Sequence, residues 1–246
     1  MKKFSKHYPI NFYHVGPDKR LTLPALMNLV QDIASDHAAL LGFGHDHLDQ
    51  DTYWVLVRQK IQMDYWPAWK EEIRIETFIA KADIGTPPRD ILIYHQDKVI
   101  GRGQTSWLVV DGKTKKIASQ KIDLLLAASV EESSGIKTQK VAVPKEGMEY
   151  LKTFSVEFSD LDMNFHVNNA IYGQWVIDSL DTEIIRNGRI VEFSINYLQE
   201  ILHQDNVIIN RKLTLIEEDI QEVLIEGKVK GATKAAFTAF VKLVLN

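Results

Sequence analysis

The sequence contains no cysteine. This absence excludes disulfides, thiolate zinc sites and a cysteine nucleophile. An excess of positive charge is also missing, because 29 Lys and Arg stand against 33 Asp and Glu, and the formal net charge is -4. A chain with this balance lacks the electrostatic signature of a general nucleic-acid binder. We therefore expect chemistry that needs no thiol, and no nucleic-acid partner.

Long apolar runs are missing as well. No segment approaches the roughly 18 apolar residues of a membrane-spanning helix. The N-terminal segment MKKFSKHYPINFY is basic but lacks the apolar stretch of a signal peptide. With 246 residues, 45% hydrophobic and 25% charged, the composition is that of a soluble globular protein with one large domain or two of ordinary size. We expect a cytoplasmic location.

The first half contains one strong helix pattern followed by strand patterns. A strand pattern at 8–13 precedes a helix that we expect to begin after Thr22, with Pro24 in its first turn, and to end at Gly42. Its apolar residues recur at helical spacing: Leu26, Leu29, Val30, Ile33, Ala34 and Leu41. Residues rich in β-branched and aromatic side chains predict strands at 53–63, 72–80, 90–95 and 104–111.

The second half repeats this order. A strand pattern at 153–158 is followed by a polar turn at 160–167 and by a helix capped by Asn168. The apolar residues of this helix are Ile171, Tyr172, Trp175, Val176 and Leu180. Strands are predicted at 190–197, 207–216, 221–230 and 235–245. The segment 127–147, with its Ser, Lys and Glu residues, indicates a connection between the halves.

Two ungapped alignments relate the halves. Phe158 pairs with Phe12 at an offset of 146 (158 minus 12), and Ile195 pairs with Ile61 at an offset of 134 (195 minus 61). Identity is low, so shared order and patterning indicate the duplication. Each half predicts one helix and four or five antiparallel strands, and the helix must bury its apolar face against the sheet. The alternative is one large α+β domain whose halves resemble each other by accident.

A polar cluster precedes the second helix. Asp162, Asn164 and His166 alternate along the segment DLDMNFHVNN, residues 160–169. In an extended segment these side chains share one face, and a turn would also gather them. The start of the helix offers unpaired backbone N–H groups, where negative charge can develop. A carboxylate, an amide and an imidazole beside a helix N-terminus are suited to acyl transfer to water.

Metal binding provides two competing readings of this cluster. The run D-L-D-M-N imitates the start of an EF-hand calcium loop, but Phe165 and Ile171 occupy the positions that require Gly and Glu. We therefore reject that reading. A metal site through Asp162 and His166 would need a further ligand, and His203 is the nearest candidate in the sequence.

Helix capping is the third competing reading, and it is serious for Asn168 and Asn169. The duplication argues that the cluster has another role. At the offset of 146 the first half has Gly16, Asp18 and Arg20 in place of the D-x-N-x-H set, so the shared scaffold does not require that set. The second offset places Trp66 opposite Glu200, for which an ordinary turn glutamate is the simpler reading.

Nearly the whole chain resembles the acyl-acyl carrier protein thioesterases in their bacterial form. The segments that resemble the family are RLTLPALMNLVQD (20–32), WVLVRQKIQM (54–63), YWPAW (65–69), SWLVVD (106–111) and, most specifically, DLDMNFHVNNAIYGQW (160–175). The resemblance implies an α+β double hotdog, in which each of two tandem repeats has a long helix wrapped by an antiparallel sheet. The sheets of the two hotdogs pack into one continuous surface in this family.

The resemblance also implies catalytic roles for particular residues. These are Asp162, Asn164, His166 and Glu200, the last of which lies at the glutamate of the family's Y-x-x-E-C pattern. The cysteine of that pattern is Ile201 here, which argues against a covalent cysteine mechanism. We expect Glu200 and His166 to activate a water molecule, Asn164 to hold the water or the carbonyl, and Asp162 to orient Asn164 or the imidazole. Backbone N–H groups at 167–169 would stabilise the oxyanion.

The resemblance further implies an N-terminal hotdog at 1–127 that shapes the acyl pocket, a linker at 128–148 and a catalytic hotdog at 149–246. Leu26, Leu29, Val30 and Ile33 are candidates for lining the pocket, although core packing explains them equally well. The expected substrate is a fatty acyl thioester of the acidic acyl carrier protein. A basic run at Lys113, Lys115 and Lys116 could receive this partner, but a solvated hairpin end is the simpler reading. We expect no cofactor and no metal. Monomer and homodimer are both open, with the dimer favoured.

Three other functions compete with this one. An acyl-coenzyme A thioesterase of the same fold would differ only in the thiol carrier. A hotdog dehydratase would act on a 3-hydroxyacyl thioester and release no thiol. A non-catalytic acyl-binding module would need a groove more than an acid–base cluster, so the polar set in one repeat argues against it.

Overall fold

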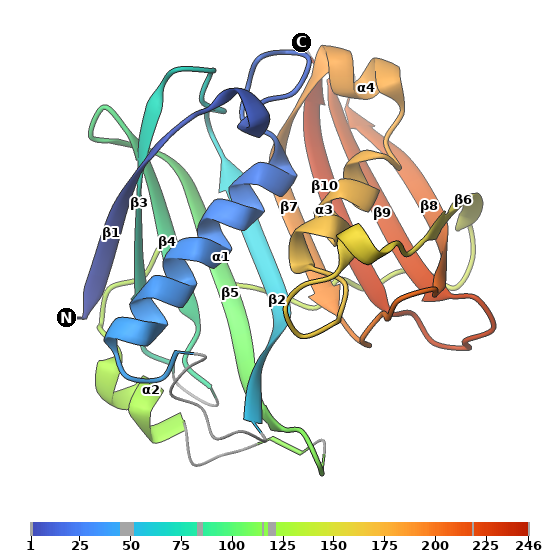
Figure 1. Cartoon of the computed structure of the whole chain (residues 1–246). Helices are drawn as coiled ribbons and strands as arrows, with labels where there is room; N and C mark the ends of the chain where they lie inside the picture. The colour runs from blue at the N-terminus through green and yellow to red at the C-terminus, as the bar shows by residue number, and fades with distance from the viewer. Residues whose placement is uncertain are drawn as a thin grey trace. The chain divides into compact units, whose positions relative to one another are not determined.

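The computed structural model describes residues 2–44, 52–82, 86–114, 116–117, 122–217 and 219–245. The chain divides into two compact units, Met1–Thr138 and Gln139–Asn246 (Figure 1). Each unit contains an antiparallel sheet with a helix lying across one of its faces. Within the described residues, no helix is long and apolar enough to cross a membrane.

The first unit is a five-stranded sheet with one long helix. Its elements are β1 (Lys3–Pro9), the short 3-10 helix η1 (Phe12–His14), α1 (Leu23–Leu40), β2 (Thr52–Met63), β3 (Glu72–Ile79), β4 (Arg89–His95), β5 (Lys98–Asp111) and α2 (Ile122–Ala128). The strand order in this unit is β1-β3-β4-β5-β2, and every neighbouring pair is antiparallel.

Helix α1 has the predicted limits. The Thr22 hydroxyl accepts a hydrogen bond from the Ala25 N–H at 3.3 Å, and Gly42 ends the segment with a φ of 78°. The predicted apolar residues Leu26, Val30 and Ile33 are at most 3% exposed. Their burial against the sheet is what stabilises this helix, because propensity alone contributes little.

Two strands of the first unit differ from their predictions. The strand predicted at 8–13 ends at Pro9, because the Asn11 N–H donates to His14 Nδ1 at 3.1 Å and turns the chain into η1. Strand β5 begins at Lys98 rather than at residue 104. Gly101 weakens the strand pattern in the sequence. A Cβ at this position would lie 2.2 Å from Met63 Sδ, so a larger residue would require the Met63 side chain to shift.

The second unit repeats the arrangement. Its elements are β6 (Glu149–Ser155), the 3-10 helix η4 (Phe158–Asp160), α3 (Asn169–Ile177), α4 (Thr182–Asn187), β7 (Gly188–Tyr197), β8 (Asn206–Glu217), β9 (Ile220–Val229) and β10 (Phe237–Leu245). The strand order in this unit is β7-β10-β9-β8-β6, again antiparallel. Both units thus share the order of strand, 3-10 helix, long helix and four further strands.

Helix α3 is shorter than predicted, and α4 was not predicted at all. The helical pattern through Leu180 is wrong in its last turn, because α3 ends at Ile177. Arg211 holds this break: Nη1 donates to the Ser179 carbonyl at 2.9 Å and to Asp181 Oδ1 at 2.8 Å. The strand predicted at 153–158 likewise ends at Ser155 and gives way to η4.

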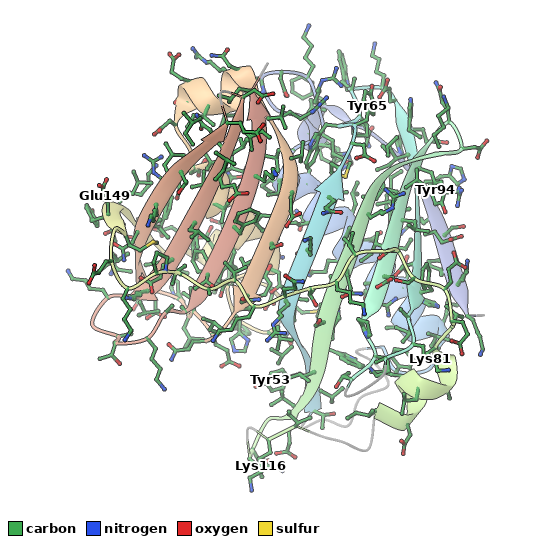
Figure 2. The ribbon with its side chains drawn as sticks, turned by 180° about the vertical axis from the view of Figure 1, so that it is seen from behind. Tyr53, Tyr65, Lys81, Tyr94, Lys116 and Glu149 are labelled. Atoms are coloured by element: carbon green, nitrogen blue, oxygen red, sulfur yellow. The ribbon has the colours of Figure 1, made fainter. Side chains whose placement is uncertain are left out.

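The connection predicted at 128–148 is hydrogen-bonded to each sheet, on the face turned away from the long helix (Figure 2). In the first unit the buried Asp90 carboxylate accepts hydrogen bonds from the Ser134 N–H at 2.6 Å and from Gln104 Nε2 at 2.8 Å. In the second unit Asn196 Oδ1 accepts from the Val141 N–H at 2.5 Å. The polar connection between the units therefore forms buried hydrogen bonds as well as contacts with solvent.

Candidate active site

The segment with the D-x-N-x-H set forms a tight turn between η4 and α3. The Asp162 N–H donates to the His166 carbonyl at 2.8 Å, and the Phe165 N–H donates to the Asp162 carbonyl at 3.0 Å. Phe165 lies in the left-handed region with a φ of 61°. The extended arrangement with alternate residues on one face is therefore wrong, and the turn alternative is correct.

The first unit forms the same turn at the offset of 146. The Gly16 N–H donates to the Arg20 carbonyl at 3.0 Å, and the Lys19 N–H donates to the Gly16 carbonyl at 2.9 Å. Lys19, the counterpart of Phe165, has a φ of 60°. The duplication inferred from weak patterning is thus confirmed in the backbone, hydrogen bond for hydrogen bond.

The segment that closes over each turn is duplicated at the offset of 134. The Val167 N–H donates to the Ile201 carbonyl at 3.1 Å, as the Leu21 N–H donates to the Pro67 carbonyl at 2.8 Å. A short antiparallel bridge joins His166 to Leu202 in the second unit and Arg20 to Ala68 in the first. The two units therefore present one scaffold with different side chains.

This scaffold brings His166 and Glu200 together. His166 Nε2 lies 3.7 Å from Glu200 Oε2, and the two side chains are 30% and 41% exposed. This acid–base pair of side chains is accessible to substrate and to water. The sequence alone favoured an ordinary turn glutamate for Glu200, and its position beside His166 is compatible with the catalytic role that the family resemblance implies. The first unit has Arg20 and Trp66 in these places, where Arg20 Nη1 donates to the Trp66 carbonyl at 2.6 Å.

Asp162 stabilises the backbone of the turn. Its Oδ1 accepts hydrogen bonds from the Asn164 N–H at 2.8 Å and from the His166 N–H at 3.3 Å. The carboxylate thus acts on Asn164 and His166 through their backbone, which fixes where both side chains start. In the first unit Asp18, the counterpart of Asn164, stabilises the turn instead. Its Oδ1 accepts a hydrogen bond from the Arg20 N–H at 3.0 Å.

The expectation that N–H groups at the helix start receive the oxyanion is wrong for two of the three groups. The Val167 N–H is engaged by Ile201, and the Asn168 N–H donates to the Asp160 carbonyl at 2.8 Å. The Asn168 side chain caps α3, because its Oδ1 accepts from the Ala170 N–H at 2.9 Å. The capping reading of Asn168 is therefore confirmed.

Sequence reasoning missed Tyr172, which it placed among the apolar residues of the helix. Tyr172 is 4% exposed, and its ring packs against Tyr197 with ring centroids 5.0 Å apart. Burial raises the pKa of Tyr172 well above its ordinary value, and the negative charges of Asp162 and Glu200 raise it further. The group therefore remains a neutral hydroxyl beneath the turn.

Other polar groups lie outside this constellation. His203, the candidate third metal ligand, packs edge-on against the Phe158 ring, with ring centroids 6.3 Å apart. Among the residues that the structure describes, no three His, Asp or Glu side chains are grouped to hold a metal ion. Lys113 and Lys116 are exposed at the turn after β5, where Figure 2 labels Lys116, and Lys115 lies outside the described residues.

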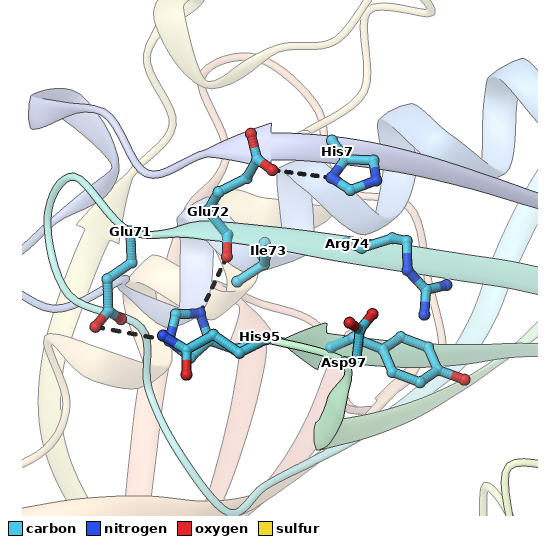
Figure 3. A pocket seen from close by; sticks show the side chains of 9 residues that line it. His7, Glu71, Glu72, Ile73, Arg74, His95 and Asp97 are labelled. Atoms are coloured by element: carbon cyan, nitrogen blue, oxygen red, sulfur yellow. Dashed lines mark hydrogen bonds and ion pairs between the residues drawn. The ribbon is translucent and has the colours of Figure 1, made fainter.

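A polar cleft of about 450 Å³ lies in the first unit, at the ends of β3 and β4 (Figure 3). Two histidine–glutamate contacts lie within it. His7 Nδ1 lies 3.0 Å from Glu72 Oε1, and His95 Nε2 lies 3.8 Å from Glu71 Oε1. Its lining residues all belong to the first unit, so it shares no residue with the predicted site.

Comparison with protein families agrees with both repeats. Residues 1–126 match the acyl-ACP thioesterase N-terminal domain, where ACP is acyl carrier protein, and residues 143–240 match the acyl-ACP thioesterase C-terminal domain. The chain belongs to the acyl-ACP thioesterase family. The resemblance to this family that the sequence motifs indicated is therefore confirmed.

Individual relatives support the same assignment. The chain is 28% identical over 94% of its length to an oleoyl-acyl carrier protein thioesterase of Coriandrum sativum, of which it covers 69%. It spans as little as 51% of the length of other curated relatives. An acyl-ACP thioesterase structure from Bacteroides thetaiotaomicron matches with a TM-score of 0.85 at 23% identity, covering 98% of both chains.

A 12:0-ACP thioesterase structure from Umbellularia californica matches with a TM-score of 0.88 at 19% identity, over 99% of this chain and 94% of that one. At such low identity these likenesses concern the fold. The α+β double hotdog predicted for this chain is confirmed.

Proposed function

We propose that this member of the acyl-ACP thioesterase family hydrolyses fatty acyl-ACP thioesters to a free fatty acid and the carrier-protein thiol. The observation that carries the proposal is the 3.7 Å approach of His166 Nε2 to Glu200 Oε2 on a turn that the first unit builds without any such pair. The first unit forms the same turn without this pair, which supports a role for the pair other than folding.

In the proposed reaction Glu200 and His166 hold and deprotonate a water molecule, whose oxygen attacks the thioester carbonyl carbon. The carbonyl oxygen becomes an oxyanion in the tetrahedral intermediate. When the carbonyl re-forms, the carbon–sulfur bond breaks, and the thiolate leaves and takes up a proton. The chain has no cysteine, and Ile201 stands at the cysteine position of the family pattern, so no thiol nucleophile takes part.

Asn164 is the group we assign to the oxyanion or to the attacking water. It lies at the exposed part of the turn, and its backbone is fixed by Asp162. Because the Val167 and Asn168 N–H groups are engaged within the fold, a side-chain amide is the better candidate for this role. Asp162 is then a positioning residue, since its carboxylate caps the turn that carries Asn164 and His166.

The two units would divide the work. We propose residues 1–127 as the hotdog that lodges the acyl chain, 128–148 as the linker and 149–246 as the catalytic hotdog. The first unit lacks the acid–base set, and the apolar face of its α1 includes Leu26, Val30 and Ile33. Lys113 and Lys116, which are exposed, are proposed to attract the acidic carrier protein.

The proposed substrate is tested by parallel assays on ACP and coenzyme A thioesters of one acyl chain, repeated over several chain lengths and scored for free thiol. We expect kcat/KM to be at least about 10-fold higher for the ACP ester, because carrier-protein contacts add binding that coenzyme A cannot make. Equal or higher values for coenzyme A would instead support an acyl-coenzyme A thioesterase. Conversion of a 3-hydroxyacyl ester without thiol release would indicate a dehydratase.

A further inference from the structure

The turn of the first unit that matches the candidate site carries cations and aromatic rings. Lys19 and Arg20 lie in the turn itself. Lys70 lies in the segment that closes over the turn, where the Trp69 N–H donates to the Lys19 carbonyl at 2.9 Å. Lys70 Nζ lies 4.5 Å from the centroid of the Trp69 ring, and the Phe12 ring packs edge-on against Trp69 with centroids 6.0 Å apart. These five residues form one cluster, which we call the basic–aromatic patch.

The basic–aromatic patch is open to solvent and positively charged. All five of its residues are exposed, and Phe12 is 76% exposed although its ring is apolar. In the part of the chain that the structure describes, none of the three cations forms an ion pair with a carboxylate. Arg20 Nη1 donates instead to the uncharged Trp66 carbonyl at 2.6 Å. Asp18 is the one acid within the turn at 16–20, so three cations stand against one carboxylate there.

The backbone that carries the patch does not require it. Lys70 and its counterpart Gln204 both lie in the left-handed region, with φ values of 73° and 69°. Glu71 and its counterpart Asp205 each accept a backbone N–H of the closing segment, at 2.8 and 2.9 Å. The second unit builds this backbone with other residues in place of the three cations: Phe165, His166 and Gln204. The cations therefore serve something other than the fold of the turn.

The two turns also differ in their acidic residues. The turn of the second unit has four carboxylates whose counterparts in the first unit are not acidic: Glu157, Asp160, Asp162 and Glu200. At the two offsets these counterparts are Asn11, His14, Gly16 and Trp66. An acidic surface is thus attracted by the turn of the first unit and repelled by the turn of the second. The attraction is local, because the whole chain has a formal net charge of -4.

We propose that the basic–aromatic patch is a docking surface for an acidic protein, the acyl carrier protein that delivers the thioester. The identity of this protein rests on the proposed function. The cations attract and orient the acidic partner, and the exposed rings of Phe12 and Trp69 supply apolar contact area. The basic run at 113–116 contains no aromatic residue, so it can attract the carrier at a distance but offers less surface for contact.

The first test removes two charges of the patch in the variant Lys19→Gln/Lys70→Gln. Glutamine already occupies the Lys70 position in the second unit, so the backbone accepts it. We expect the Kd for holo-ACP, which carries no acyl chain, to rise at least about 10-fold in surface plasmon resonance, because electrostatic attraction is lost. KM for an acyl-ACP ester should rise in parallel, with kcat within about 2-fold.

Two controls accompany this variant. Lys230→Gln/Lys234→Gln removes the same charge at exposed positions of the second unit and should leave the Kd for holo-ACP within about 2-fold. The neutral N-acetylcysteamine thioester of the same acyl chain has no carrier protein, so its kcat/KM should be equal in wild type and in the patch variant. A patch variant that binds holo-ACP as tightly as wild type would overturn the proposal.

The second test addresses the aromatic part of the patch. Trp69→His imports His203 from the matching position of the second unit and removes the ring that Phe12 and Lys70 contact. Loss of contact area should raise the dissociation rate of holo-ACP about 3- to 10-fold, whereas loss of the lysines should mainly lower the association rate. An unchanged dissociation rate in Trp69→His would reduce the patch to long-range attraction and contradict its role as a docking surface.

The fate of this surface is separable from that of the proposed function. Patch-dependent binding of holo-ACP by a chain that releases no thiol from any acyl-ACP ester would support the surface and refute the function. Vesicles of phosphatidylcholine and phosphatidylglycerol provide the remaining comparison. If the lysine variant loses binding to these vesicles but not to holo-ACP, the patch recognises a lipid surface, and the carrier-protein proposal is wrong.

Discussion

Giving the second unit the turn residues of the first is expected to abolish thioester hydrolysis in a chain that still folds. The triple variant Asp162→Gly, Asn164→Asp and His166→Arg reproduces Gly16, Asp18 and Arg20. Those residues hold the same backbone turn, with the Gly16 N–H to Arg20 carbonyl hydrogen bond at 3.0 Å. The aspartate introduced by Asn164→Asp would supply the cap that Asp18 supplies in the first unit. The variant therefore removes the chemistry and keeps a backbone that this fold already accepts.

The expected loss in kcat is at least about 10³-fold, since general acid–base catalysis alone is typically worth 10²–10⁴. Steady-state thiol release from an acyl-ACP ester measures it, and circular dichroism with thermal unfolding checks the fold. Asn168→Thr is the matched control, because Thr22 caps α1 where Asn168 caps α3. That variant also carries a first-unit residue, yet it should retain most of the activity. Triple-variant activity within 10-fold of wild type would show that the D-x-N-x-H set is not catalytic.

Glu200→Gln is expected to lower kcat about 10²- to 10⁴-fold while KM changes little. The substitution keeps the shape of the side chain but removes the carboxylate that can take a proton from water beside His166. Binding of the acyl chain and of the carrier protein does not involve this proton, so the loss should appear in kcat. Thiol release over a range of acyl-ACP concentrations separates the two parameters.

The control for this variant is Glu183→Gln, which makes the same change at an exposed position in the first turn of α4. It should leave both kcat and KM within about 2-fold of wild type. If Glu200→Gln behaves like Glu183→Gln, Glu200 is an ordinary turn residue, as the sequence alone suggested.

The repeat could be predicted from the sequence because both long helices and most strands carry strong local patterns. The cap at Thr22 and the stop at Gly42 are local signals, and the structure keeps both. The break after Ile177 could not be predicted, because it depends on Arg211, a residue brought alongside from β8. The prediction for β5 was too short for a similar reason, since Gly101 leaves space for Met63 from a neighbouring strand.

The candidate site divides in the same way. The D-x-N-x-H set is contiguous, so it was visible as a motif, whereas a catalytic role for Glu200 came only from the family resemblance. Its approach to His166 depends on the hydrogen bond between Val167 and Ile201, which no spacing in the sequence encodes. Tyr172 was hidden because a tyrosine at a helical core position resembles any other apolar residue.

A single-turnover experiment with the enzyme in excess over acyl-ACP examines whether activated water attacks the thioester. Free thiol and free fatty acid are followed by rapid quench, and the intact protein is weighed by mass spectrometry at each time. Direct attack by water predicts that thiol and fatty acid appear at the same rate and that the protein keeps its mass throughout. A burst of thiol ahead of fatty acid, with protein heavier by one acyl group, would contradict this mechanism.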